Sequence, residues 1–215
     1  MQFQLHHFFC SFGRMKNTLI LLIVTFFGLQ MNGQDLSVLD SIQAKGSTIQ
    51  SISSHITQNV VKSGNTEIVE GTLNYVSPDK MAAHFDNGDY FIINENRMKV
   101  DIGMFHGKFK LSRNKFMRSM SQIYLYAFQG RCQELAEVNN YDLQLNAEDK
   151  FYIVKFTSKK KNFLGIGYKQ ILFYYEQNTL IINQIALIDY NDIIETFTVS
   201  EPQFDVSISE NYFEL

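Results

Sequence analysis

Tryptophan is absent from this chain of 215 residues, and proline and cysteine are scarce, at two residues each. So little cysteine excludes a small domain that is held together by disulfides. The formal net charge of −3 lacks the basic excess of a dedicated nucleic-acid binder. In place of tryptophan the chain has 19 Phe and 11 Tyr, and 45% of its residues are hydrophobic. Such a composition excludes a disordered chain and, at this length, allows a single globular domain.

The N-terminus carries the pattern of a secretory signal peptide. Met15 and Lys16 precede a short uncharged apolar run, and small and polar residues lead to Gly33. The run is shorter than the roughly 20 apolar residues that a membrane span needs. We expect residues 1–33 to be an N-terminal extension and cleaved signal peptide, with the true start at Met15, and residues 34–215 to be one exported domain. An uncleaved membrane anchor is the alternative.

A helix opens the expected domain. Leu36, Leu39 and Ile42 follow helical spacing, and Gly46 is expected to end the helix. From residue 49 onward apolar residues recur with a period of two between turn residues. The segments with this pattern are predicted strands: 49–61, 67–76, 80–85, 90–94, 97–102, 141–145, 151–157, 168–175, 180–188 and 193–200.

The alternation is broken once, between Phe109 and Gly130. Phe116, Met120 and Tyr124 fall on one face of a predicted helix there, and Gly130 follows its end. Evenly spaced strands with local turns predict one antiparallel sheet that is curled or closed to limit its edges. The fold class is therefore mainly β with some α.

Sequence signatures of catalysis are missing. There is no P-loop, dinucleotide fingerprint, His-Glu-x-x-His run or Gly-x-Ser-x-Gly elbow. His55, His84 and His106 are scattered, whereas a metal site needs clustered ligands. Cys132 is expected to be a buried residue without a catalytic role. We predict a binding protein that is not an enzyme and has no cofactor and no metal.

Alternate residues of the predicted strands, which share one face of the sheet, are unusually apolar, and this face has two possible interpretations. It is either a solid core beneath the helices or the wall of a cavity for an apolar ligand. Methionines of the central helix suit the second interpretation, because their flexible side chains adapt to varied apolar shapes. The candidate lipid-binding residues are Leu73, Tyr75, Met81, Phe85, Phe91, Ile93, Met117, Met120, Phe173, Ile185, Leu187 and Phe197.

Three segments, in this order, resemble the outer-membrane lipoprotein carrier protein (LolA) family. Residues 52–58 look like the family's first strand, residues 70–81 like its first hairpin, and residues 91–97 like the turn that follows. The resemblance covers about residues 35–200. It implies an incomplete antiparallel β-barrel, or curved sheet, with helices covering the concave side.

The resemblance also implies a function. Such a chain is expected to be a monomer in the periplasm that holds the acyl chains of lipoproteins in its apolar concavity. It would receive this cargo from an inner-membrane lipoprotein-releasing transporter and deliver it to an outer-membrane acceptor, with no role for nucleic acid.

Two departures from the family pattern keep alternatives open. Many members carry an Arg immediately before the hairpin Pro, as a latch between barrel and lid, and Ser77 stands there in this chain. Residues 202–215 replace the family's closing segment, as an additional strand or a frayed end. The alternative cargo is therefore a non-protein lipid or pigment, such as a glycolipid or an aryl polyene. An envelope enzyme of unrecognised chemistry is the third hypothesis.

Overall fold

The structure is a computed structural model that describes residues 35–102, 105–159 and 167–215. The chain divides into two units, residues 1–38 and residues 39–215. Of the first unit, only the start of helix α2 (Asp35–Thr48) is among the described residues. The predicted signal peptide lies outside them and stays a prediction. No helix among the described residues is both long enough and apolar enough to span a membrane.

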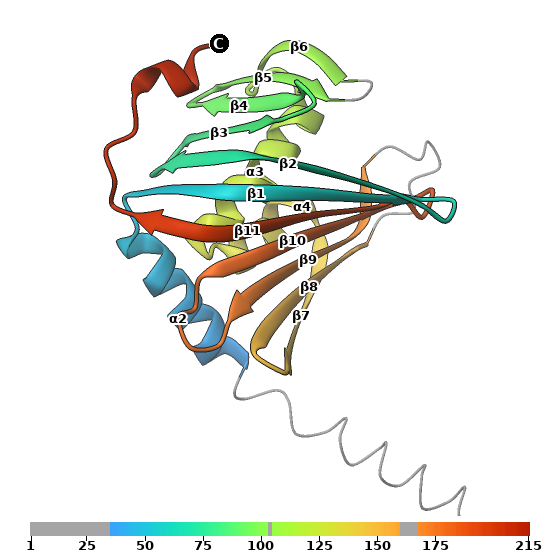
Figure 1. Cartoon of the computed structure of the whole chain (residues 1–215). Coiled ribbons are helices and arrows are strands. Elements are labelled where there is room, and N and C mark those ends of the chain that lie inside the picture. Colours follow the sequence, from blue (N-terminus) through green and yellow to red (C-terminus); the bar gives the residue numbers. More distant parts are fainter. Residues whose placement is uncertain (1–34, 103–104, 160–166) are drawn as a thin grey trace, which may run out of the picture. The chain divides into compact units, whose positions relative to one another are not determined.

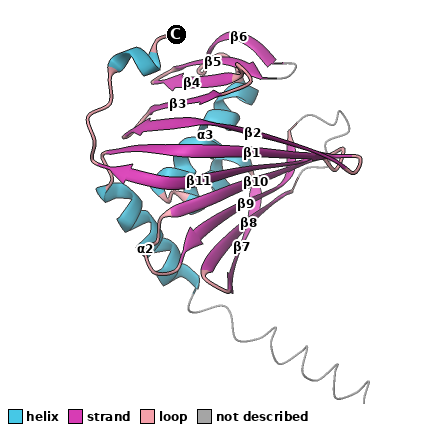
Figure 2. Cartoon of the chain, viewed as in Figure 1, coloured by secondary structure: helices cyan, strands magenta, loops and turns pink. Residues whose placement is uncertain are grey.

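An eleven-stranded antiparallel sheet dominates the second unit (Figures 1 and 2). Its spatial order is β6-β5-β4-β3-β2-β1-β11-β10-β9-β8-β7, so that both halves of the chain meet at the long central strands β1 and β11. The strands are β1 (Ser51–Lys62), β2 (Asn65–Val76), β3 (Lys80–Phe85), β4 (Tyr90–Asn94), β5 (Arg97–Ile102), β6 (Phe105–Lys110), β7 (Tyr141–Glu148), β8 (Phe151–Ser158), β9 (Tyr168–Glu176), β10 (Ile182–Asp189) and β11 (Ile194–Phe204).

The sheet is curved and open, and helices α3 (Lys115–Gln129) and α4 (Cys132–Asn139) lie on its concave side (Figure 1). Among the described residues β6 and β7 form its two edges. The expected fold class, a curved antiparallel sheet with helices over the concave face, is confirmed. Strand β6 and helix α4 are additions that the sequence pattern did not predict.

Helix α3 has clear local signals at both ends. The Asn114 side chain accepts a hydrogen bond from the backbone N–H of Met117 at 3.0 Å, which satisfies one free donor of the first turn. Gly130 ends the helix in the left-handed region, with φ of 67°. Between these caps one face of the helix is buried and packs against the sheet.

The expectation that Gly46 ends the first helix is wrong, because α2 continues to Thr48. A Cβ at Gly46 would collide with the backbone of Gln129, and a Cβ at Gly130 would collide with that of Ile42. The two glycines therefore allow α2 to approach the end of α3 backbone to backbone. Gly46 serves this close packing and not helix termination.

Residues 205–215 fold back on the outer face of β3 and β4. The 3₁₀ helix η1 (Glu210–Phe213) buries Phe213 against Ala82 and Ile92. The Asn94 side chain donates to the carbonyl of Phe213 at 3.1 Å. Of the predicted tail, residues 202–204 continue strand β11, and residues 205–215 form neither an added strand nor a frayed end. The tail explains why Ile92, on the outer face, is apolar.

We predict that Phe213→Ala lowers the free energy of unfolding by about 3 kcal/mol, because it removes a buried ring and leaves a cavity over Ala82 and Ile92. Chemical denaturation followed by circular dichroism measures this change. Tyr212→Ala is the matched control, since Tyr212 is 45% exposed and should cost little. Equal effects of the two substitutions would contradict the tail's structural role.

Candidate functional site

A cavity of about 480 Å³ lies between helix α3 and the concave face of the sheet. This volume is in the range of small-molecule sites in proteins. Its wall draws on α3, on strands β1, β2, β4 to β6 and β9 to β11, and on the turns beside them. Several residues at its rim are exposed, Glu67 and Asn191 among them, so the cavity is open to solvent there.

Strand register brings the central part of the wall together. Val60 on β1 is paired with Glu195 on β11, and Glu195 is paired with Leu187 on β10. Gln58 lies two residues from Val60 on the same face of β1. Residues that are more than 100 positions apart in the sequence therefore form one row of cavity wall.

Aromatic rings close the inner end of the cavity. Tyr124 of α3 stacks on Phe91 of β4, with ring centroids 4.7 Å apart, and meets Phe197 of β11 edge-on at 5.6 Å. Both geometries are favourable for aromatic pairs. At the rim, Phe105 stacks on Phe116 at 5.6 Å and is 39% exposed. The cavity therefore has an aromatic floor and an aromatic edge that faces solvent.

Four of the twelve candidate lipid-binding residues line the cavity: Phe91, Met117, Met120 and Leu187. The other eight are at most 5% exposed and fill the interior beside it: Leu73, Tyr75, Met81, Phe85, Ile93, Phe173, Ile185 and Phe197. The apolar face thus provides both a solid core and a cavity wall, at different positions along the strands. That the four cavity residues bind a ligand stays a prediction.

Sequence reasoning missed the polar part of the wall. Gln58 lies between Ile56 and Val60 on one face of β1, Glu195 is two residues before Phe197 on β11, and the structure places both polar residues in the cavity wall. A polar residue at a position that faces the core is the signal that would have identified them. Apolar wall residues were missed as well: Val60, Val69, Met98, Val100, Ile102, Phe105, Phe116, Tyr124 and Ile193.

Glu195 is a half-buried carboxylate in this wall. The amide nitrogen Nε2 of Gln58 donates to its Oε1 at 2.6 Å. Burial raises the pKa of Glu195, the Gln58 hydrogen bond opposes the shift, and the charge of Asp189 adds to it. Tyr168 lines the same wall, and its pKa is raised well above the ordinary value by burial and by the charge of Glu195.

Cys132 lies outside the cavity wall and is buried. Its sulfur is 3.4 Å from the hydroxyl of Tyr175, which in turn donates to the carbonyl of Ala127 at 2.8 Å. Burial raises the pKa of the thiol to about 12, so the reactive thiolate is scarce at neutral pH. The expectation of a buried Cys132 is confirmed. Among the described residues no three His, Cys, Asp or Glu gather into a possible metal site.

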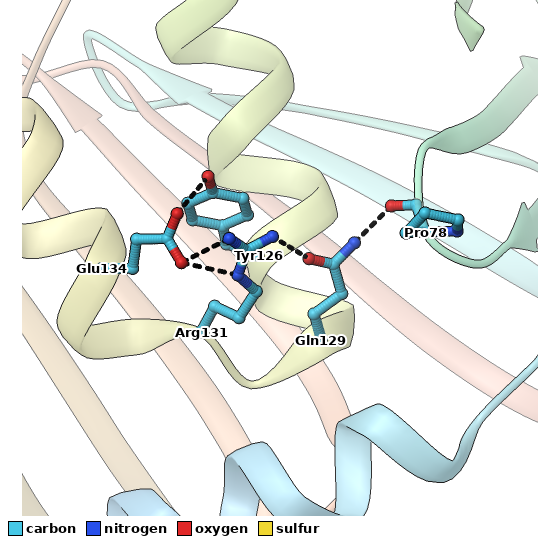
Figure 3. A network of polar contacts seen from close by, with 5 residues as sticks. All are labelled: Pro78, Tyr126, Gln129, Arg131 and Glu134. Atoms are coloured by element: carbon cyan, nitrogen blue, oxygen red, sulfur yellow. Dashed lines mark hydrogen bonds and ion pairs between the residues drawn. The ribbon is translucent and has the colours of Figure 1, made fainter. Parts of the chain in front are cut away.

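A polar network at the end of α3 joins the helix to the β2–β3 hairpin at Pro78 (Figure 3). The side-chain nitrogen of Gln129 donates to the carbonyl of Pro78. Arg131 donates to Oε1 of Gln129 at 3.0 Å and forms an ion pair with Glu134. The side chain that links α3 to the hairpin, that of Gln129, thus belongs to the helix.

Glu134, on α4, accepts hydrogen bonds from Tyr126 and Arg131. Tyr126 donates to its Oε1 at 2.9 Å, and the guanidinium of Arg131 lies 4.3 Å from the centre of the Tyr126 ring. Burial opposes ionisation of Glu134, but the hydrogen bonds from Arg131 and Tyr126 outweigh it and lower the pKa of the carboxyl. The charge of Arg131 is therefore balanced within the helical layer.

Comparison with protein-family models and with curated protein sequences gives no match. Solved structures with a similar fold include a DUF1329 family protein from Desulfovibrio piger, 17% identical over 83% of this chain and 96% of that one, with a TM-score of 0.44. A LolA superfamily protein from Nitrosomonas europaea is 9% identical over 82% and 97% of the two chains, with a TM-score of 0.40. The lipoprotein LppX of Mycobacterium tuberculosis is 11% identical over 83% and 99%, with a TM-score of 0.38.

Each of these matches has a TM-score below 0.5 and an identity below 20%. Because their identities and TM-scores are low, we take the function of this chain from its own cavity and residues.

Glu195→Gln should stabilise the protein at neutral pH. A carboxyl whose pKa is raised by folding binds more protons in the folded state, so stability falls as pH rises from the ordinary Glu pKa toward the raised value. Thermal unfolding should show a higher Tm for Glu195→Gln at pH 7, and a difference that shrinks toward about pH 4. Glu201→Gln, at an exposed position of the same strand, is the control. A Glu195→Gln protein less stable than the unsubstituted chain at pH 7 would refute this assignment.

Proposed function

We propose that this chain is a non-catalytic carrier that binds acyl chains of lipoproteins in the cavity between α3 and the sheet. The observation that carries the proposal is the largely apolar wall of a cavity that is open at its rim. A fully packed core would hold no ligand, and a closed cavity would not admit one.

Transfer free energies explain why such a wall suits an acyl chain. Each methylene removed from water contributes about 0.8 kcal/mol, so a carrier of lipid in an aqueous compartment needs a matching apolar surface. Met98, Met117 and Met120 supply part of that surface. Their flexible thioether side chains accommodate alkyl chains of different shape without directional bonds. This kind of binding is reversible, as a carrier requires.

The finer proposal follows from the sequence resemblance. The chain works in the periplasm as a monomer, after cleavage of its signal peptide. It takes lipoproteins from an inner-membrane lipoprotein-releasing transporter and passes them to an outer-membrane acceptor. Solvent-exposed Phe105 at the rim of the cavity is a suitable first contact for an incoming chain.

A non-protein lipid or pigment is the second candidate cargo. The observation that favours it is the cavity volume of about 480 Å³, which lies in the range of single small ligands. Mass spectrometry of lipid extracts from the purified protein separates the two cargoes. Acylated peptides support the lipoprotein carrier, and free lipid or pigment without acylated peptide supports the second candidate.

Binding of N-phenyl-1-naphthylamine, a dye that fluoresces in apolar sites, tests the carrier function directly. The unsubstituted chain should bind the dye, and Met120→Glu should weaken binding at least about tenfold, because a carboxylate in the cavity wall must be desolvated when the dye enters.

Ile68→Glu is the matched control for that change. Ile68 is 62% exposed and lies outside the cavity wall, so this substitution adds the same charge at the surface. Circular dichroism establishes that both variants fold. Unchanged binding by a folded Met120→Glu protein, or equal loss in the two variants, would count against the cavity as the binding site.

A further inference from the structure

The charged residues that the structure describes in the cavity wall all have the same sign. Among the described residues that line it, the charged ones are Glu67, Asp89, Asp189 and Glu195, and none is Lys, Arg or His. Glu67 is at the exposed rim, whereas Glu195 lies deeper, in the row between Val60 and Leu187. A wall of this sign attracts cations and repels anions at the mouth of an otherwise apolar site.

Glu195 has no base beside it among the described residues of the cavity wall. The side-chain amide of Gln58 donates a hydrogen bond to one carboxylate oxygen of Glu195 at 2.6 Å. Because the amide is neutral, it does not compensate the negative charge of the carboxylate. The neighbouring ionisable group that acts on it electrostatically is the acid Asp189. A charge held in an apolar wall without a counter-ion is costly, and a bound cation relieves that cost.

Aromatic rings complete the surroundings of this carboxylate. Tyr168 and Tyr124 line the same cavity, and both interact electrostatically with Glu195. Ring faces attract cations, so their presence is compatible with a positively charged ligand group.

We propose that the cavity selects amphiphiles whose polar end is an ammonium group, with the alkyl chain against the methionine and aromatic wall and the ammonium beside Glu195 and Gln58. This selectivity rests on the proposed function, since it requires that the cavity binds alkyl chains. It adds a cargo class, because a lipid that ends in a carboxylate or phosphate would meet four acidic side chains and no base among the described wall residues.

Competition with the naphthylamine dye by decylamine, 1-decanol and decanoate tests this selectivity, because the three compounds share one chain length and differ in the charge of the polar end. We expect decylamine to bind at least about tenfold more tightly than decanoate at pH 7, with decanol between them. Glu195→Gln should bring decylamine close to decanol. Glu201→Gln, the same charge change outside the cavity on the same strand, should leave the order unchanged.

The outcomes separate this inference from the proposed function. If all three compounds bind with equal affinity, or decanoate binds best, the ammonium preference is wrong and the carrier function stands. If none of the three binds, both are wrong. If decylamine keeps its advantage in Glu195→Gln, Glu195 is not the recognition group and the inference is overturned.

A second arm identifies the source of the ammonium group. A diacylated lipopeptide with a free N-terminal amine is compared with its N-acetylated form in the same competition. Preference for the free amine supports the inference with a lipoprotein as the source. Equal binding of the two peptides, together with the decylamine preference, supports it with a free aminolipid as the source.

Discussion

The packing of Tyr124 against Phe91 and Phe197 organises the concave face of the sheet. This one side chain of α3 contacts strands from both halves of the chain, with centroid distances of 4.7 and 5.6 Å. Residues such as Phe173 and Ile185 are almost fully buried and fill the interior. Tyr124 itself lines the cavity between the helix and the sheet. The same interaction therefore stabilises the fold and forms the floor of the proposed binding site.

Glu195 shows a conflict between stability and binding. Placing a carboxyl in this wall raises its pKa, which means that folding disfavours its charged form. A leucine or methionine there would suit an apolar core better. Uncompensated polar groups in apolar walls are typical of sites where a ligand supplies the missing partner. The cost of Glu195 to the free protein and its value for an ammonium ligand have one physical origin.

Sequence periodicity predicted the meander, the central helix and the fold class, because alternation along a strand is a local property. It did not predict α4, β6 or the tail, whose short segments depend on contacts made elsewhere: Phe213, for example, acquires a role only when it meets Ala82 and Ile92. The candidate site was predicted only in part, because the position of a residue in the cavity wall also depends on contacts between distant segments. Alternation indicates that Leu187 and Ile185 share a face, but only strand register and the position of α3 decide that Leu187 borders the cavity and Ile185 does not. The hydrogen bond from the Gln129 side chain to the carbonyl of Pro78 joins residues 51 positions apart, so local sequence patterns did not predict it.

Native mass spectrometry of the chain purified from the cells that produce it is the most direct test of a cavity that carries a lipid. The carrier function predicts a population with one amphiphile bound per chain, released when the gas-phase collision energy is raised, and absent from Met120→Glu purified in the same way. A chain that is always recovered at its unliganded mass, even when detergent is avoided throughout, would contradict it.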